Sequence, residues 1–329
     1  MKCTNKRSRI TAILFLACLL LGGCNGNQLP MAYDPEVNVS AYRFEKSSSS
    51  AGEEGKASPF AEQLCLQDEE TLPTGAVDLS EALSGVLCDI NGKRIVYAKD
   101  ENLQLAPASL TKVLTALVAL KHGELDMVLT ASENVKINES GATLLGLEPG
   151  DKMTLDQALH ALLMQSANDV AVMIAENIGG SEEAFCEMMN AEAKALGATN
   201  SNFKNPHGLT QDDHYSCAYD MYLIFQEVMK YSEFTQIIHQ DAYETIYYDA
   251  EGNAKEYSCA TTNLFLRGDY TPPEGISVVG GKTGTTAAAR NCLILLSKDS
   301  SGNPYVSVIL NCSERQYLYQ EMTGLLDQI

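Results

Sequence analysis

The sequence predicts a mixed α/β fold of the α+β kind, in which an antiparallel sheet is flanked by helices and carries an inserted helical lobe. Three observations predict it. A hairpin signal lies near residue 90, helical periodicity fills the middle of the chain, and three short apolar segments separated by Gly, Asn and Pro lie near its end. Because strands at both ends enclose the helices, we expect one sheet to collect strands that are far apart in sequence.

Length and composition are those of a globular protein. The chain has 329 residues, enough for one large domain or two modest ones, with 45% hydrophobic and 20% charged residues. Asp and Glu number 43 against 23 Lys and Arg, which gives a net charge of −20. Proteins that bind nucleic acid carry a basic surface, so we expect no nucleic-acid partner.

The first 24 residues resemble an export signal and not part of the fold. A basic start is followed by an apolar run over residues 10–21, shorter than the roughly 20 residues of a membrane-spanning helix. The run ends in Leu21-Gly22-Gly23-Cys24, which resembles a bacterial lipoprotein signal. We therefore predict that Cys24 carries lipid and anchors the protein to the extracytoplasmic face of a bacterial membrane. The alternative is a plain secretory signal.

Residues 25–72 predict a flexible tether, because the stretch from Arg43 to Pro59 is rich in Ser, Gly and Glu and poor in apolar periodicity. The remaining residues, 73–329, are expected to form one folded domain. Beyond Cys24 the cysteine spacings show no disulfide framework, and we interpret these residues as small buried hydrophobes. They are Cys65, Cys88, Cys186, Cys217, Cys259, Cys292 and Cys312.

The elements of residues 73–329 follow in order. Asn91-Gly92 between two apolar runs, 86–90 and 94–98, is a strong hairpin signal. A helix opens at Ser109 and stops at Gly123. Caps and apolar spacing predict helices over 155–164, 170–178 and 181–196, strands over 276–279, 292–297 and 305–311, and a closing helix over 316–328.

Three short motifs carry the chemistry: S-x-x-K at Ser109 to Lys112, S-x-N at Ser166 to Asn168, and K-T-G at 282–284. S-x-x-K and S-x-N each recur elsewhere in the chain, and each motif alone is compatible with a helix cap or a strand edge. Their order and context favour catalysis. The first opens a helix, the second joins two helices, and the third lies on an expected strand.

These residue types suit nucleophilic catalysis. A serine hydroxyl needs a base, and on a helix Lys112 is the i+3 neighbour of Ser109. Lysine acts as a base only if burial or nearby positive charge, here from Lys282, lowers its pKa. Ser166 can relay a proton to the leaving amine. Asn168 can hold a peptide amide and the lysine in register.

Together with longer stretches, the motifs resemble the penicillin-binding D-alanyl-D-alanine carboxypeptidases of the serine peptidase type. The resemblance runs from about Leu79 to the C-terminus and includes residues 107–117, 166–209 with Asn205-Pro206-His207-Gly208-Leu209, and 262–286. It implies a β-lactamase/transpeptidase-like fold.

The resemblance also implies roles. Ser109 would be the acyl-forming nucleophile, Lys112 its base, Ser166 the proton relay, Asn168 the substrate positioner and Lys282 the electrostatic partner. Thr283, Gly284 and Thr285 would bind substrate, with the N–H groups of Ser109 and Thr285 as oxyanion hole. The implied substrate is the D-Ala-D-Ala end of a peptidoglycan stem peptide, and β-lactams would acylate the same serine. No cofactor or metal is implied.

Some positions depart from the family pattern. Arg290 follows three alanines where the family commonly has Gly after Ala, so the turn beyond the third motif is expected to differ. Arg315 is a candidate for holding the substrate carboxylate, but its spacing is long and we do not assign it. We interpret His207 as structural, because the serine already has a lysine partner.

Two other functions remain in competition. A serine β-lactamase shares the motifs, but no Glu between Asn168 and Lys282 is followed by x-x-Leu-Asn, and Ala167 stands where those enzymes favour Asp. The other is a non-catalytic, lipid-anchored binding protein, which would not need the four catalytic side chains. The balance between hydrolysis and transpeptidation stays open, since one acyl-enzyme serves both.

Overall fold

The computed structural model describes residues 64–65, 70–73 and 75–329. The expected export signal, Cys24 and most of the expected tether lie outside these residues. Within the described part, no helix is long and apolar enough to cross a membrane.

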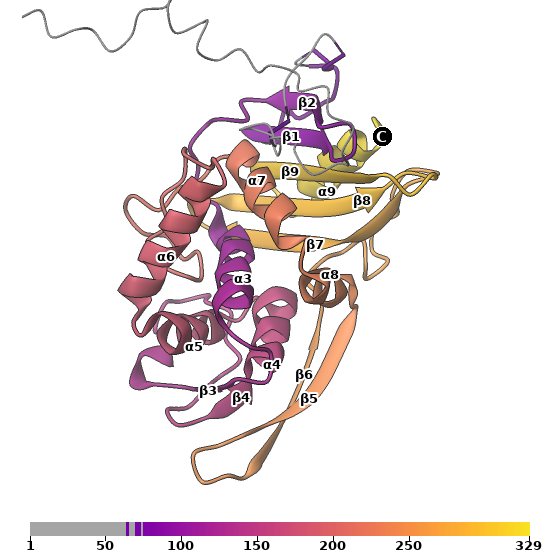
Figure 1. Ribbon diagram of the computed structural model, residues 1–329. Helices are drawn as coiled ribbons and strands as arrows, with labels where there is room; N and C mark the ends of the chain where they lie inside the picture. Colours follow the sequence, from indigo (N-terminus) through magenta and orange to yellow (C-terminus); the bar gives the residue numbers. More distant parts are fainter. Residues whose placement is uncertain (1–63, 66–69, 74) are drawn as a thin grey trace, which may run out of the picture. The chain divides into compact units, whose positions relative to one another are not determined.

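A five-stranded antiparallel sheet forms the centre of the domain (Figure 1). Its strand order is β2-β1-β9-β8-β7, so the first and last strands of the domain lie side by side, with Gly85 opposite Ile309. The expected hairpin around Asn91-Gly92 is confirmed, with Asp89 opposite Arg94. The strands are β1 (Ser84–Asp89), β2 (Arg94–Lys99), β7 (Ser277–Thr286), β8 (Arg290–Lys298) and β9 (Pro304–Cys312).

Helices cover both faces of this sheet (Figure 1). Alternate strand residues point to opposite faces, and accordingly Leu293 and Ile309 pack with α9 (Arg315–Leu326), whereas Ile294 and Val308 pack with the larger core. That larger core contains α3 (Thr111–His122), α7 (Ala218–Val228) and α8 (Ser232–His239). The expected fold class, an antiparallel sheet flanked by helices, is confirmed.

The expected helical lobe is present, with one change. Residues 155–164 do not form one helix, because α4 (Leu155–His160) passes into a π-helical turn, η3 (Ala161–Gln165). The next two helices agree with expectation. They are α5 (Asn168–Gly179), ended by left-handed Gly180, and α6 (Glu182–Ala195), capped by the Ser181 side chain.

A second antiparallel sheet, absent from the sequence-based expectation, extends the lobe (Figure 1). The expectation of a single sheet was therefore incomplete. Two of its strands are three residues long, and the other two form a hairpin in which half-buried residues alternate with exposed ones, so no continuous apolar run marks them. The strands are β3 (Val128–Thr130), β4 (Lys152–Thr154), β5 (Ala242–Tyr248) and β6 (Ala254–Ala260), in the order β3-β4-β5-β6.

Two described pieces of the expected tether contact the domain. Cys65 is buried, with its Sγ 2.7 Å from the Tyr222 hydroxyl. The Leu72 N–H donates to the Val96 carbonyl at the edge of the sheet. Cys65 and the other described cysteines carry free thiols; six of the seven are buried, as expected, and Cys259 is half-buried.

Candidate active site

The nucleophile candidate Ser109 lies in η1 (Ala108–Leu110), a single 3-10 turn that leads directly into α3. Ala108 has a left-handed backbone, with φ 48°, which is uncommon for a residue with a Cβ. The turn places Ser109 one helical turn ahead of Lys112, and the Lys112 Nζ lies 3.1 Å from the Ser109 Oγ. This is the neighbour relation expected from the S-x-x-K spacing.

Lys112 is fully buried, and its amine is surrounded by acceptors. Besides Ser109, it contacts the Asn168 Oδ1 at 2.6 Å and the His207 carbonyl at 2.5 Å. Burial lowers the pKa of Lys112 well below its usual value, and the charge of Lys282 lowers it further, while Asp169 opposes the shift. Both lowering causes favour the neutral amine that a general base requires.

Ser166 ends the π-helical turn in a left-handed conformation, with φ 72°, and α5 begins two residues later at Asn168. Its side chain lines the same cleft as Ser109. Among the described residues, the buried Ser166 Oγ has no hydrogen-bond partner. Buried hydroxyls are almost always hydrogen-bonded within the protein. The Ser166 hydroxyl is not, so its hydrogen-bonding capacity is available to a bound ligand.

Asp169 holds the wall of the cleft opposite β7. Its buried carboxylate accepts the backbone N–H groups of Leu145, Gly146 and Leu147 at 2.7–3.0 Å. The Asn168 N–H donates to the carbonyl of Thr143, whose residue lines the cleft. The start of α5 thus ties this loop to the second motif.

The third motif lies in the middle of β7, the edge strand nearest η1. Lys282 is fully buried, and burial lowers its pKa to about 7. The Thr283 hydroxyl is 2.7 Å from that of Thr262. At Gly284 a Cβ would lie 3.0 Å from the Ser109 nitrogen and 3.1 Å from the Ala108 Cβ. Glycine therefore lets β7 approach the nucleophile turn closely.

The cleft brings most of the predicted residues together. It is lined by Ser109, Ser166 and the substrate-binding candidates Thr283, Gly284 and Thr285. Three predicted residues are not part of the lining. Lys112 contacts Ser109 and Asn168, and the charge of Lys282 lowers the pKa of Lys112.

Two arginines also line the cleft, and among its lining residues there is no Asp or Glu. Arg315, considered from the sequence but not assigned, is the first residue of α9. Arg267 was missed, because it lies in an irregular segment and outside any motif. Its Nε is 3.3 Å from the Asp269 carboxylate. The only available signal was its closeness to Thr262-Asn263-Leu264.

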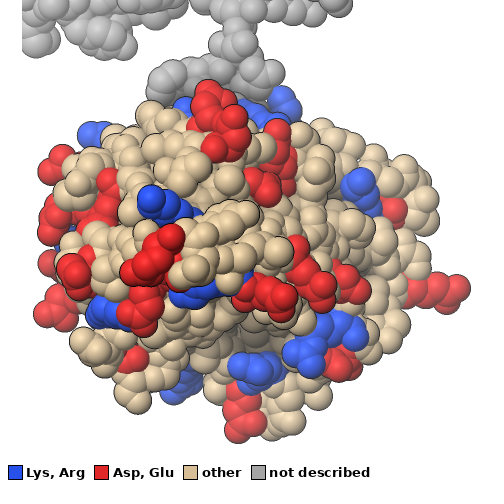
Figure 2. Space-filling model, turned by 90° about the horizontal axis from the view of Figure 1, so that it is seen from below, with Lys and Arg blue, Asp and Glu red and all other residues tan. Residues whose placement is uncertain are grey.

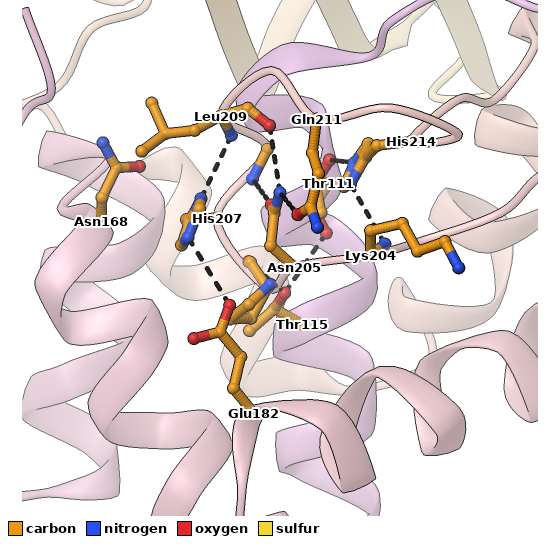
Figure 3. Close-up of polar contacts among 12 residues, drawn as sticks. Thr111, Thr115, Asn168, Glu182, Lys204, Asn205, His207, Leu209, Gln211 and His214 are labelled. Carbon is orange, nitrogen blue, oxygen red and sulfur yellow. Dashed lines mark hydrogen bonds and ion pairs between the residues drawn. The ribbon is translucent and has the colours of Figure 1, made fainter. Parts of the chain in front are cut away.

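A loop of five residues, Asn205 to Leu209, carries the His207 carbonyl that accepts from Lys112. Figure 3 shows the side chains of Asn205, His207 and Leu209 in this loop. The Asn205 side chain donates to the Leu209 carbonyl at 3.0 Å and accepts the Gly208 N–H at 2.7 Å. The Thr115 hydroxyl of α3 donates to the Pro206 carbonyl at 2.6 Å. The loop is thereby fixed both internally and against the helix that carries Lys112.

The His207 side chain lies between Leu209 and Glu182 (Figure 3). Its Nδ1 accepts the Leu209 N–H, and its Nε2 lies 3.8 Å from the Glu182 carboxylate. Burial, with the charges of Lys112 and His214, lowers the pKa of His207 to about 3, so the ring is neutral. Its backbone carbonyl is the His207 atom that contacts Lys112.

No group of three or more His, Cys, Asp or Glu side chains in the described part of the chain is arranged to hold a metal ion.

Comparison with known proteins gives a consistent result. A sequence profile for D-alanyl-D-alanine carboxypeptidases matches residues 73–314. The carboxypeptidase DacF of Bacillus subtilis is 37% identical over 254 residues, covering 75% of this chain and 61% of DacF. A D-alanyl-D-alanine carboxypeptidase of Mycobacterium tuberculosis is 32% identical over 231 residues, covering 69% of this chain and 75% of the relative. This chain thus spans about three fifths of the length of DacF.

Solved structures agree on the fold. A DD-transpeptidase from Streptomyces superposes with a TM-score of 0.69 at 24% identity, covering 75% of this chain and 96% of the other. A penicillin-binding protein homologue from Mycobacterium tuberculosis superposes with a TM-score of 0.68 at 27% identity, covering 80% and 95%. The expected transpeptidase-like fold is confirmed.

Proposed function

The chain belongs to the D-alanyl-D-alanine carboxypeptidase family of serine peptidases, and we propose that it removes the terminal D-Ala from peptidoglycan stem peptides through an acyl-enzyme on Ser109. One observation carries this proposal. The Ser109 hydroxyl contacts a fully buried lysine whose pKa is lowered by burial and by a second lysine. A binding protein without catalysis has no use for this arrangement.

Acylation uses four residues. Neutral Lys112 takes the proton of Ser109 as the Oγ bonds to the carbonyl carbon of the penultimate D-Ala. The N–H groups of Ser109 and Thr285 stabilise the oxyanion. As the tetrahedral intermediate collapses, the C–N bond breaks, Ser166 passes a proton to the leaving nitrogen, and D-Ala departs. Water then attacks the ester, and its proton returns through the same groups.

The free carboxylate of the substrate is bound at the cationic end of the cleft. Lys282 provides a positive charge next to Thr283, and Arg315 lies in the same cleft lining. The protein as a whole is acidic, and the face in Figure 2 bears many acidic side chains with basic ones among them. Recognition of an anionic peptide end thus depends on these local cations and not on the overall field.

A fluorescent penicillin tests the proposal. The full chain is incubated with it and the adduct is mapped by mass spectrometry. We expect one adduct, on Ser109, lost in Ser109→Ala and in Lys112→Ala. An adduct elsewhere, or none, would refute the assignment.

Two further assays separate the competing functions. Release of D-Ala from diacetyl-Lys-D-Ala-D-Ala is expected of the enzyme and not of an inert binding protein. Fast, sustained hydrolysis of nitrocefin would instead favour a β-lactamase, whereas slow stoichiometric acylation agrees with the carboxypeptidase.

We also propose that Cys24 carries lipid and holds the enzyme at the extracytoplasmic face of the membrane. The supporting observation is the basic start and apolar run that end in Leu-Gly-Gly-Cys. Labelling cells with an alkyne fatty acid should mark the protein, and Cys24→Ala should abolish the label. A label that persists in this variant would contradict the proposal.

A further inference from the structure

A chain of hydrogen bonds links the segment after α6 to the nucleophile turn (Figure 3). The Lys204 N–H donates to the His214 Nδ1 at 3.2 Å. The His214 Nε2 lies 2.9 Å from the Thr111 hydroxyl, which donates to the Ala108 carbonyl at 2.8 Å. Thr111 is fully buried and His214 is 6% exposed, so water does not compete strongly for these bonds.

The bond from the Lys204 N–H to His214 determines which atom donates in each of the following bonds. A backbone N–H can only donate, so the His214 Nδ1 must accept, and in a neutral ring the Nε2 then carries the hydrogen. Nε2–H therefore donates to the Thr111 oxygen, which leaves the hydroxyl hydrogen for Ala108. Burial and the charge of Lys112 lower the pKa of His214 to about 4, so this neutral tautomer is the form present at neutral pH.

The carbonyl at the end of the chain belongs to the peptide unit whose N–H is that of Ser109. In a planar trans peptide the C=O and the N–H point in opposite directions. The Ala108 carbonyl also accepts the Thr111 N–H, so two bonds from one residue fix the orientation of this peptide plane. The Ser109 N–H then points away from Thr111. Its nitrogen lies on the side where β7 passes, 3.0 Å from where a Cβ on Gly284 would be.

We propose that Thr111 and His214 are positioning residues that aim the Ser109 N–H into the oxyanion hole. The inference rests on the proposed acylation of Ser109. It explains why a residue with φ 48° precedes the nucleophile. That conformation is held by the hydrogen-bond chain on one side and, on the other, by Gly208, where a Cβ would lie 1.9 Å from the Ala108 oxygen.

Thr111 gives the first test, since it can be replaced with or without its hydroxyl. Thr111→Val keeps the shape and removes the donor, whereas Thr111→Ser keeps the donor. We expect the rate constant for acylation by penicillin to fall about 10- to 100-fold in the valine variant, a loss comparable to or smaller than removal of one oxyanion-hole donor. The serine variant should stay within roughly threefold of the wild type, because its hydroxyl can make the same bond.

His214 gives the second test. His214→Phe removes both ring nitrogens, whereas His214→Gln retains an N–H donor at the position of Nε2. The phenylalanine variant should lose acylation rate as the valine variant does, and glutamine should restore part of it. His160→Phe is the matched control, because His160 is also 6% exposed and hydrogen-bonded but does not contact the nucleophile turn. It should acylate at the wild-type rate even if it unfolds at a lower temperature.

A peptide boronic acid distinguishes aiming of the oxyanion hole from general loosening. Its boron bonds to the Ser109 oxygen and forms a tetrahedral adduct that places an oxygen where the oxyanion develops. Its inhibition constant should rise in parallel with the loss of acylation across the Thr111 and His214 variants, while the KM for the D-Ala-D-Ala peptide changes less than about threefold.

The outcomes separate the two proposals. If wild-type protein is not acylated on Ser109, the proposed function fails and this inference with it. If the wild type is acylated but Thr111→Val and His214→Phe react at the same rate, only this inference fails. It also fails if serine is as damaging as valine at position 111, or if boronate binding stays constant while acylation slows.

Discussion

Two buried lysines in one site perform different tasks because their surroundings differ. Burial and the charge of Lys282 both favour the neutral form of Lys112. Burial alone lowers the pKa of Lys282 to about 7, so a substantial fraction of it carries a proton near neutral pH.

The first prediction concerns pH. Because the pKa of Lys282 is lowered to about 7, the free enzyme loses this positive charge as the pH rises through that value. We expect kcat/KM for a D-Ala-D-Ala peptide to decline on the alkaline side with an apparent pKa near 7. Lys282→Arg keeps its charge at every accessible pH. An alkaline decline that stays in place in this variant would show that another group titrates.

The second prediction concerns Ser166. Since its buried hydroxyl has no partner among the described residues, Ser166→Ala removes no hydrogen bond of the folded state. The melting temperature should shift by no more than about 2 °C, whereas kcat should fall about 10²- to 10⁴-fold if the hydroxyl relays a proton. Calorimetry and D-Ala release measure the two quantities. A variant that loses stability but keeps kcat would assign Ser166 a structural role instead.

At the scale of elements, turn and cap residues correctly predicted where the hairpin and several helices begin and end. Asn91-Gly92 formed its hairpin, and Ser181 and Gly180 began and ended helices as their types require. The π-helical turn before Ser166 was not predictable. Nothing in the periodicity of residues 155–164 distinguishes it from a continuing helix.

The close approach of η1 and β7 gives the third prediction. Gly284→Ala would place a Cβ against the Ser109 nitrogen and the Ala108 Cβ and push the two elements apart. The clash is relieved by a shift of a few tenths of an ångström. Since a misplacement of about 1 Å can reduce the rate about 10²-fold, we expect acylation by penicillin to fall about 3- to 10-fold. Gly324→Ala is the control, because its Cβ would meet only Val77, at 3.6 Å. Equal acylation rates in both variants would mean that the approach is not needed.

At the scale of the whole molecule, the two ends of the domain meet in one sheet, and the lobe between them carries the second motif. β1 pairs with β9, so the sheet is complete only after the last strand is made. Of the two loop histidines, His214 is buried and His207 is half-buried, and both are neutral because their pKa values are lowered. Charging them therefore opposes the folded state as a whole.

The fourth prediction concerns acid stability. The pKa values of His207 and His214 are about 3 and 4 in the folded protein, below the usual 6.5. Between the folded and unfolded pKa values, the unfolded chain binds more protons than the folded protein. The contribution of the two histidines to the free energy of unfolding therefore falls as the pH is lowered from about 6.5 to about 4. Urea unfolding at several pH values measures the slope. His214→Gln should have a shallower slope than the wild type, and identical slopes would contradict the assignment.

The sequence by itself determined what depends on near neighbours along the chain. The i, i+3 spacing put Lys112 beside Ser109, and caps and turn residues set the hairpin and most helices. Only the tertiary structure decided which distant groups complete the site. The His207 carbonyl on Lys112, the second sheet and the arginines in the cleft all arise from long-range packing. Such contacts leave no periodic trace, because they depend on how separate segments fit together in space.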